Sequence, residues 1–218
     1  MTQRYVTIAE DTPGHFELEI KRSRFLGVAR GAADEVAARQ VINTARKQYP
    51  DARHHCSAFT YLPAGWENGV QPVQHSSDDG EPSGTAGRPM LDVLLGSELQ
   101  NACVVVTRYF GGIKLGTGGL VRAYSEAAQG AIAAAQREEV KSVPVVSFDV
   151  AANRAAALES WLHSRNCKPL SVTWSNRVTL ELAVEGGTQD ELAAALAAQL
   201  GAPVTFSNAG IKVVRSRL

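Results

Sequence analysis

Beyond Lys141, segments with the apolar spacing of strands and of helices follow one another in an order that few folds can satisfy. A period of two residues predicts a strand, and a period near 3.6 predicts a helix. The segments alternate as strand, helix, strand, strand, helix and strand over 143–150, 153–164, 170–174, 178–184, 190–200 and 204–214, the last one interrupted. This βαββαβ order is that of the ferredoxin-like fold. The pattern therefore predicts a ferredoxin-like domain over residues 140–218.

The preceding residues follow another pattern. Alternation up to Gly31 predicts short antiparallel strands, and apolar residues four apart from Ala37 to Tyr49 predict a helix that Pro50 ends. Further elements are expected as a strand over 51–61, a helix over 89–95, a central strand over 102–110 and an Ala-rich helix over 120–137. The stretch 63–83 is expected to be a long loop. A charged run at 138–142 marks a domain boundary, so we predict a two-domain α+β protein divided into 1–139 and 140–218.

Composition and charge exclude several classes of protein. The 22 Lys and Arg residues balance 22 Asp and Glu, so nucleic-acid binding would have to come from a local patch. Three widely spaced cysteines exclude a complete disulfide framework and a CxxC metal or redox motif. No stretch approaches about 18 uninterrupted apolar residues, and the chain start lacks a secretory pattern. We expect a cytoplasmic protein without membrane contact.

A glycine-rich segment, Gly111–Gly119, joins the predicted central strand to the Ala-rich helix. It matches neither the P-loop nor the dinucleotide-binding template. Small residues before a helix start let backbone N–H groups face an anion, and Arg108, Lys114 and Arg122 lie close by in sequence. Two aromatic residues follow Arg108, as single-stranded RNA recognition requires. Phosphate or RNA contact is one interpretation, and tight helix packing that needs glycines is the other.

An acidic segment, Ser77–Gly87, holds three carboxylates, those of Asp78, Asp79 and Glu81, and also Thr85. Hard oxygen ligands in a Gly- and Pro-rich segment suit Mg²⁺. The spacing does not fit the twelve-residue calcium loop. In the other interpretation, Asp78 or Asp79 caps a turn at Gly80 and the carboxylates are solvated or anchor neighbouring arginines such as Arg88.

A third segment, Arg53–Cys56, holds two adjacent histidines. Neighbouring strand residues point to opposite faces, so His54 and His55 cannot both reach one metal without a bulge. One packed and one surface histidine is the expected arrangement. Cys56 is not expected to be a nucleophile, because adjacent strand residues diverge and no third, orienting residue can be named. We therefore predict no catalytic residue, no resident metal and no cofactor.

Together, Arg53–Cys56, Ser77–Gly87 and Arg108–Gly116 resemble the IMPACT family, specifically its bacterial two-domain, YigZ-like members. The resemblance spans the whole chain in order and length. It implies a first domain similar to domain IV of elongation factor G, of the left-handed βαβ type, and a ferredoxin-like second domain similar to domain V. Eukaryotic relatives share the first domain and regulate translation under stress. For bacterial members, the resemblance implies a ribosome- or nucleic-acid-associated role without an established reaction.

The shared surface of the family corresponds here to Arg53, His54, His55, Asp78, Asp79, Glu81, Thr85, Arg108, Lys114 and Thr117. Our leading hypothesis is a translation-associated regulatory protein that binds RNA or the ribosome. Its contacts would be the glycine-rich segment with Arg53, His54, His55, Arg108, Lys114, Thr117 and Arg122. The alternative is a metal-dependent hydrolase of a phosphorylated or peptide substrate that uses Asp78, Asp79, Glu81 and one histidine. A third hypothesis is a protein partner bound at the loop around Trp66.

Overall fold

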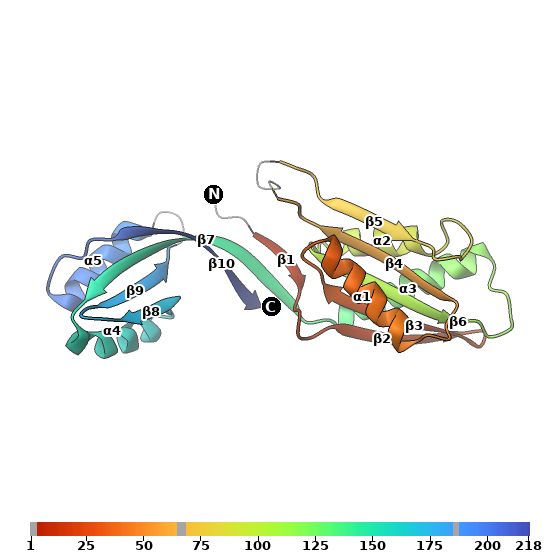
Figure 1. Ribbon diagram of the computed structural model, residues 1–218, viewed down its shortest axis with the longest axis horizontal. Coiled ribbons are helices and arrows are strands. Elements are labelled where there is room, and N and C mark those ends of the chain that lie inside the picture. The colour runs from red at the N-terminus through yellow and green to blue at the C-terminus, as the bar shows by residue number, and fades with distance from the viewer. Residues whose placement is uncertain (1–3, 65–68, 185–187) are drawn as a thin grey trace. The chain divides into compact units, whose positions relative to one another are not determined.

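The computed structural model describes residues 4–64, 69–184 and 188–218 and confirms an α+β protein with two parts (Figure 1). The larger compact unit comprises residues 5–139 and 216–218, and the smaller unit comprises residue 4 and residues 140–215. Trp66, the centre of the third hypothesis, lies outside the described residues. Among the described residues, no helix combines the length and apolar character needed to cross a bilayer.

The larger unit is built on a five-stranded antiparallel sheet. Its strands, in spatial order, are β2 (Gly14–Ile20), β3 (Ser23–Gly31), β6 (Ala102–Tyr109), β4 (His54–Tyr61) and β5 (Val73–Ser77). The run Val104–Val106 predicts a central strand because β-branched residues fit a pleated surface that is buried on both faces. The prediction is confirmed, since β6 is buried from Ala102 to Arg108.

Helices cover both faces of this sheet. Helix α1 (Glu35–Gln48) packs on Cys103 and Val105, whereas α2 (Gly87–Gly96) and α3 (Thr117–Ala134) pack on Val104 and Val106. Figure 1 shows α1 on the near face of the sheet and α2 and α3 behind it. This three-layer arrangement follows from strand alternation, which sends successive side chains of β6 to opposite faces. No face of β6 is therefore left for solvent.

Several elements and boundaries differ from the sequence predictions, and three of these differences have a clear physical reason. The expected loop over 63–83 contains β5, which pairs with β4 through backbone bonds that its polar residues did not signal. Helix α3 begins at Thr117, three residues earlier than expected, because Gly118 and Gly119 are tolerated within its first turn. Strand β7 (Arg137–Val150) begins before the charged run that we took as a boundary.

The smaller unit has the predicted βαββαβ order. Its elements are β7, α4 (Ala152–Ser164), β8 (Ser171–Trp174), β9 (Val178–Ala183), α5 (Gln189–Leu200) and β10 (Ser207–Arg217). In the sheet, β8 pairs with β9, β9 with β7, and β7 also with β10, which is the strand order of the ferredoxin-like fold. Strand β1 (Arg4–Ile8) also lies next to β7 in this sheet. Buried Leu158, Leu180 and Leu196 show why both helices stay on the sheet.

Candidate nucleic-acid interface

The glycine elbow, Gly111–Gly119, connects the end of β6 to the start of α3. Residues 112–114 and 116–118 are exposed. A Cβ atom added at Gly112, Gly116 or Gly118 would meet nothing within 4 Å. Tight packing therefore does not explain these three glycines. It does explain glycines on the strands, since a Cβ on Gly27 would lie 2.7 Å from the Ala127 carbonyl oxygen of α3.

The start of α3 is open to solvent. Gly116 is its N-cap residue, with φ of 76°, and no side chain in the described part of the chain caps this end. The first helical N–H groups have no intrahelical acceptor, and the helix dipole places partial positive charge beside them. Leu120 N–H is the first to bond within the helix, to the Gly116 carbonyl at 3.0 Å. An anion can approach the N–H groups of residues 117–119 without displacing a capping side chain.

The first residue of the elbow, Gly111, packs against the turn between β2 and β3. Gly111 N–H donates to Ser23 Oγ at 3.1 Å. A Cβ on Gly111 would lie 2.1 Å from the Arg22 carbonyl carbon, so only glycine fits this approach. The turn residues Lys21 and Arg22 have φ of 49° and 64° and are exposed. Two cations that we did not select from the sequence therefore lie beside the elbow.

Three of the cations predicted for this site, Arg53, Lys114 and Arg122, are also exposed. Arg53 immediately precedes β4, whose first residue pairs with Arg108 near the end of β6. Lys114 is within the elbow, and Arg122 lies in the second turn of α3. We call Lys21, Arg22, Arg53, Lys114 and Arg122 the elbow cations. Among the residues that the structure describes, none of the five forms an ion pair.

Arg108 was expected to reach a phosphate, and the structure corrects this expectation. Its side chain is only 7% exposed and pairs with Glu81, Nη1 to Oε1, at 2.6 Å. The guanidinium carbon lies 5.4 Å from the Phe25 ring centroid and 5.5 Å from that of Phe110. Tyr124 donates its hydroxyl to the same Glu81 oxygen at 2.8 Å. Arg108 is thus a buried partner of Glu81, because both faces of β6 are covered by helices.

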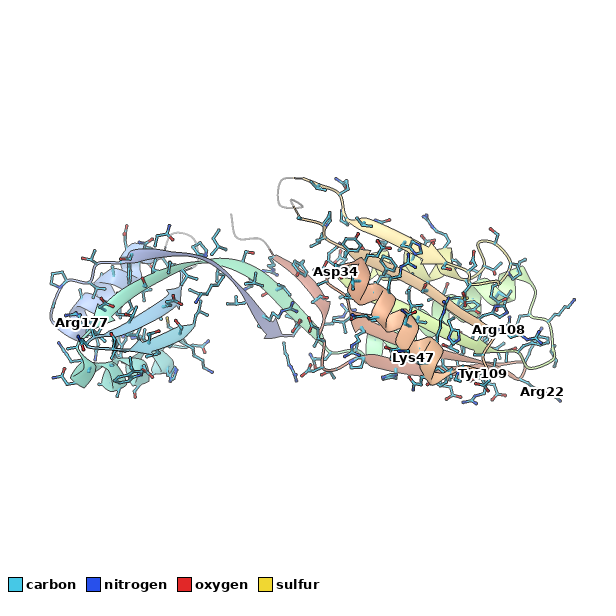
Figure 2. The ribbon with its side chains drawn as sticks, viewed as in Figure 1. Arg22, Asp34, Lys47, Arg108, Tyr109 and Arg177 are labelled. Atoms are coloured by element: carbon cyan, nitrogen blue, oxygen red, sulfur yellow. The ribbon has the colours of Figure 1, made fainter. Side chains whose placement is uncertain are left out.

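The strand register nevertheless brings Arg108 to the end of the sheet where the elbow begins. Figure 2 shows Arg22, Arg108 and Tyr109 at this same end. Tyr109 donates to Asp51 at 2.7 Å, and Phe110 is 53% exposed. Of the two aromatic residues that follow Arg108, Phe110 is the one that offers an open ring to a ligand.

The acidic segment is bonded to the protein itself. Asp78 accepts N–H groups of Gly84, Ala86 and Gly87 at 2.8–2.9 Å, at the start of α2. Burial raises the pKa of the Asp78 carboxyl, but the three N–H donors outweigh burial and hold it below its usual value. Asp79 accepts from the His55 N–H and from Arg46, each at 2.7 Å.

Thr85 completes this inward-bonded segment. Its hydroxyl donates to the Pro82 carbonyl at 2.6 Å, and the side chain is buried. Within residues 4–64, 69–184 and 188–218, no group of three or more His, Cys, Asp or Glu side chains could hold a metal ion. The interpretation of the carboxylates as anchors for arginines fits this geometry, but the anchored residues are Arg46 and Arg108. Arg88, which we expected in that role, pairs with Asp92 instead.

The two histidines take different positions. His54 is half-buried, and its Nδ1 donates to the Asp79 carbonyl at 2.9 Å. His55 is buried, with Nδ1 3.0 Å from Thr107 Oγ1. Burial lowers the pKa of His55, opposed by the nearby Asp79 carboxylate. Burial also raises the pKa of the Cys56 thiol to about 12, so at neutral pH the group is not the thiolate that a nucleophile requires.

Comparisons with known proteins identify the family. The Impact N-terminal domain model matches residues 21–132. YigZ of Escherichia coli (strain K12), named as an IMPACT family member, is 35% identical over 179 residues, which cover 82% of this chain and 86% of that protein. YvyE of Bacillus subtilis (strain 168), also named as an IMPACT family member, is 46% identical over 126 residues, which cover 58% of this chain and 54% of that protein. This second match spans about half the length of the relative.

A solved structure matches nearly the whole chain. The crystal structure of a hypothetical protein covers 94% of this chain and 97% of its own, with 32% sequence identity and a TM-score of 0.59. Sequence and structure thus agree over both parts of the molecule. Because the family model matches just over half of the chain and YigZ aligns over most of it, the chain belongs to the IMPACT family as a YigZ-like member.

Proposed function

We propose that this YigZ-like protein is a translation-associated regulator that binds RNA or the ribosome through the glycine elbow and the elbow cations. Membership of a family whose eukaryotic relatives regulate translation supports a role in translation. The geometry of the elbow supports the ligand. The observation that carries the proposal is the exposed, uncapped start of α3 at Gly116, together with the elbow cations, which form no ion pair in the described part of the chain.

The exposed N–H groups at the start of α3 are suited to bind phosphate oxygens. Glycines at 116 and 118 leave space for a bulky phosphodiester to approach the N–H groups, because no side chain stands in front of them. Lysines and arginines around the site would neutralise further phosphates and release counterions. Phe110 and Ile113, which are 53% and 43% exposed, offer apolar surface for an unstacked base.

The formal net charge of zero does not oppose this proposal. Carboxylates at this end of the sheet are engaged by the protein: Asp79 pairs with Arg46, Glu81 pairs with Arg108, and Asp51 accepts the Tyr109 hydroxyl. The elbow cations form no ion pair with any residue that the structure describes. The proposal therefore requires a locally positive field at the elbow, although the whole chain is neutral.

The metal-dependent hydrolase is not proposed further. It needs Asp78, Asp79 and Glu81 to turn toward a common ion, but each of these carboxylates accepts hydrogen bonds from neighbouring protein groups. Breaking these bonds would uncap α2 and leave Arg108 unpaired in the interior.

The test is the affinity for single-stranded RNA, measured by fluorescence anisotropy at several salt concentrations, together with co-sedimentation with ribosomes. A double variant, Arg22→Ala with Lys114→Ala, should weaken binding and reduce the slope of log affinity against log salt by about two. The matched control is Arg30→Ala, an exposed arginine at the opposite end of β3. Affinity and slope that stay unchanged in the folded double variant would refute the proposal.

A further inference from the structure

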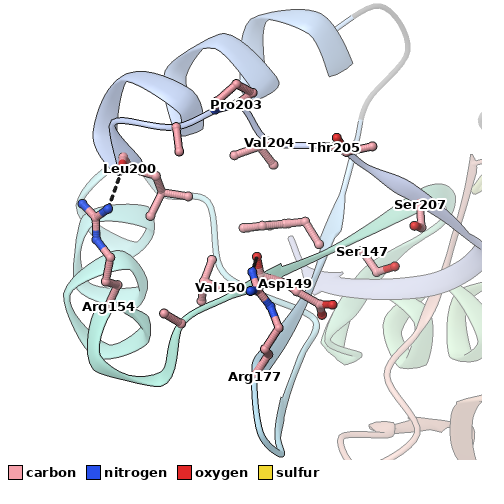
Figure 3. Close-up of a pocket in the computed structure, with 13 residues that line it drawn as sticks. Ser147, Asp149, Val150, Arg154, Arg177, Leu200, Pro203, Val204, Thr205 and Ser207 are labelled. Carbon is pink, nitrogen blue, oxygen red and sulfur yellow. Dashed lines mark hydrogen bonds between the residues drawn. The ribbon is translucent and has the colours of Figure 1, made fainter.

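A cavity of about 470 Å³ opens in the smaller unit, far in sequence from the elbow. It lies between the end of β7 and the segment that joins α5 to β10 (Figure 3). A volume of this size suits a small organic ligand. Its walls come from residues 147–151, Arg154, Arg177, Leu200, residues 202–205 and Ser207.

Two arginines reach this cavity from different elements. Arg154, on α4, donates to the Leu200 carbonyl and, at 3.4 Å, to the Gln199 carbonyl at the end of α5. Arg177, from the turn between β8 and β9, donates through Nη2 to the Asp149 carbonyl at 3.2 Å. Figure 3 shows Arg177 rising from this turn toward the space below Val204. Each guanidinium is thus held in place by a carbonyl and keeps further N–H donors for a ligand.

The charge and shape of the lining favour an anion with both polar and apolar parts. Among the described residues of the lining, Asp149 is the single carboxylate, and it already accepts the Thr179 hydroxyl at 2.6 Å. The lining therefore carries two guanidinium groups against one carboxylate. Hydroxyls of Ser147, Thr205 and Ser207 lie along one side, and Phe148 and Val204 add apolar surface.

We propose that this cavity binds a phosphorylated small molecule of the nucleoside monophosphate class. A guanidinium group binds phosphate oxygens in a bidentate manner, so Arg177 would hold the phosphate, and Arg154 would add positive charge to the lining. The serine and threonine hydroxyls match sugar hydroxyls, and the apolar side chains match the face of a base. The α4 start beside Ala151 adds partial positive charge to the same end. This site is independent of the elbow.

The experiment is a calorimetric titration of the full chain with AMP, with adenosine and inorganic phosphate as separate probes. Arg177→Ala should weaken AMP binding at least tenfold, and Arg177→Lys should restore part of it as a point charge. Arg177 lies in an exposed turn, so its loss should not unfold the unit, whereas Arg154 also caps α5. The control is Arg165→Ala, whose guanidinium lies 4.6 Å from the Trp161 ring centroid, outside the cavity.

A further measurement distinguishes a free nucleotide from the 5′-phosphate of an RNA as the ligand. A 5′-phosphorylated RNA oligonucleotide is compared with the same oligonucleotide lacking that phosphate. Preference for the phosphorylated end, lost in Arg177→Ala, would place an RNA terminus in the cavity, whereas AMP binding alone would indicate a free nucleotide. Absence of saturable binding of every probe at millimolar concentration would overturn the proposal, as would binding that is the same in Arg177→Ala and in the wild type.

Discussion

The acidic segment and the glycine elbow lie at the same end of one sheet, yet their polar groups have different partners. Asp78, Asp79 and Glu81 each accept hydrogen bonds from nearby protein groups. The elbow leaves Gly116–Gly118 exposed and the start of α3 uncapped. The acidic segment therefore stabilises the fold, whereas the N–H groups at the start of α3 remain available to a ligand.

The difference teaches that residue type alone does not identify a binding surface. Arg108 and Lys114 look equally suited to a phosphate in the sequence, but one is paired in the interior and the other is exposed. Breaking a buried ion pair lowers the free energy of unfolding by several kcal/mol, whereas removing an exposed lysine changes it little. Stability and RNA affinity should therefore respond to different residues.

The largest expected effect breaks the buried pair. Arg108→Ala leaves the Glu81 carboxylate without its cation, and should lower the free energy of unfolding by about 3–5 kcal/mol. Urea denaturation followed by circular dichroism measures it. A variant of wild-type stability that no longer binds RNA would show that Arg108 is a ligand residue after all.

A paired replacement sharpens this result. Replacing both partners, Arg108→Met with Glu81→Leu, removes the unpaired charge and should recover much of the lost stability. Tyr124 then loses its acceptor, so recovery stays incomplete.

The cap of α2 should give the next effect. Asp78→Ala removes the acceptor of three N–H groups and should cost about 2 kcal/mol, measured by the same denaturation. Because the folded-state pKa of Asp78 is lowered, its contribution is fully present above the unfolded pKa of about 4 and is lost as pH falls through the folded value. Asp78→Ala should flatten the acid dependence of stability, and an unaltered dependence would contradict this assignment.

A smaller, pH-dependent effect concerns His55. Its pKa is lowered by burial, so the unfolded chain binds the proton more readily. Stability should fall as pH decreases below about 6.5, with a limiting slope of about 1.4 kcal/mol per pH unit. His55→Gln removes this titration. Denaturation curves of the wild type and of His55→Gln at pH 7.5 and 5.5 isolate the contribution of His55, because the other histidines are the same in both proteins. An equal loss of stability between the two pH values in both proteins would exclude His55 as the cause.

Strong local patterns predicted much of this fold. The βαββαβ order and the central position of Val104–Val106 follow from apolar spacing, because those segments bury one or two whole faces. Strand β5 could not be predicted, since its Gln, His and Ser side chains carry no apolar period and only pairing with β4 defines it. Similarly, nothing local marks where β7 begins.

The candidate site was predicted only in part. Alternation correctly separates His54 from His55, but it cannot tell that both faces of β6 are covered, and so it misplaced Arg108. Lys21 and Arg22 were missed because their place beside Gly111 depends on a contact across about ninety positions. Both residues have positive φ in a hairpin turn, where Asn and Gly are the usual residues, so the pair Lys21-Arg22 gave no sequence signal for this turn.

The most direct test of the open elbow is the substitution Gly118→Asp, assayed for both stability and RNA affinity. A side chain fits at this exposed position in the first turn of α3, and a carboxylate there interacts favourably with the helix dipole. The account predicts stability equal to or slightly above that of the wild type, together with RNA affinity reduced at least tenfold by repulsion of phosphate, while Gly118→Ala binds nearly normally. RNA affinity of Gly118→Asp equal to that of the wild type would contradict the central claim that this helix start receives phosphate.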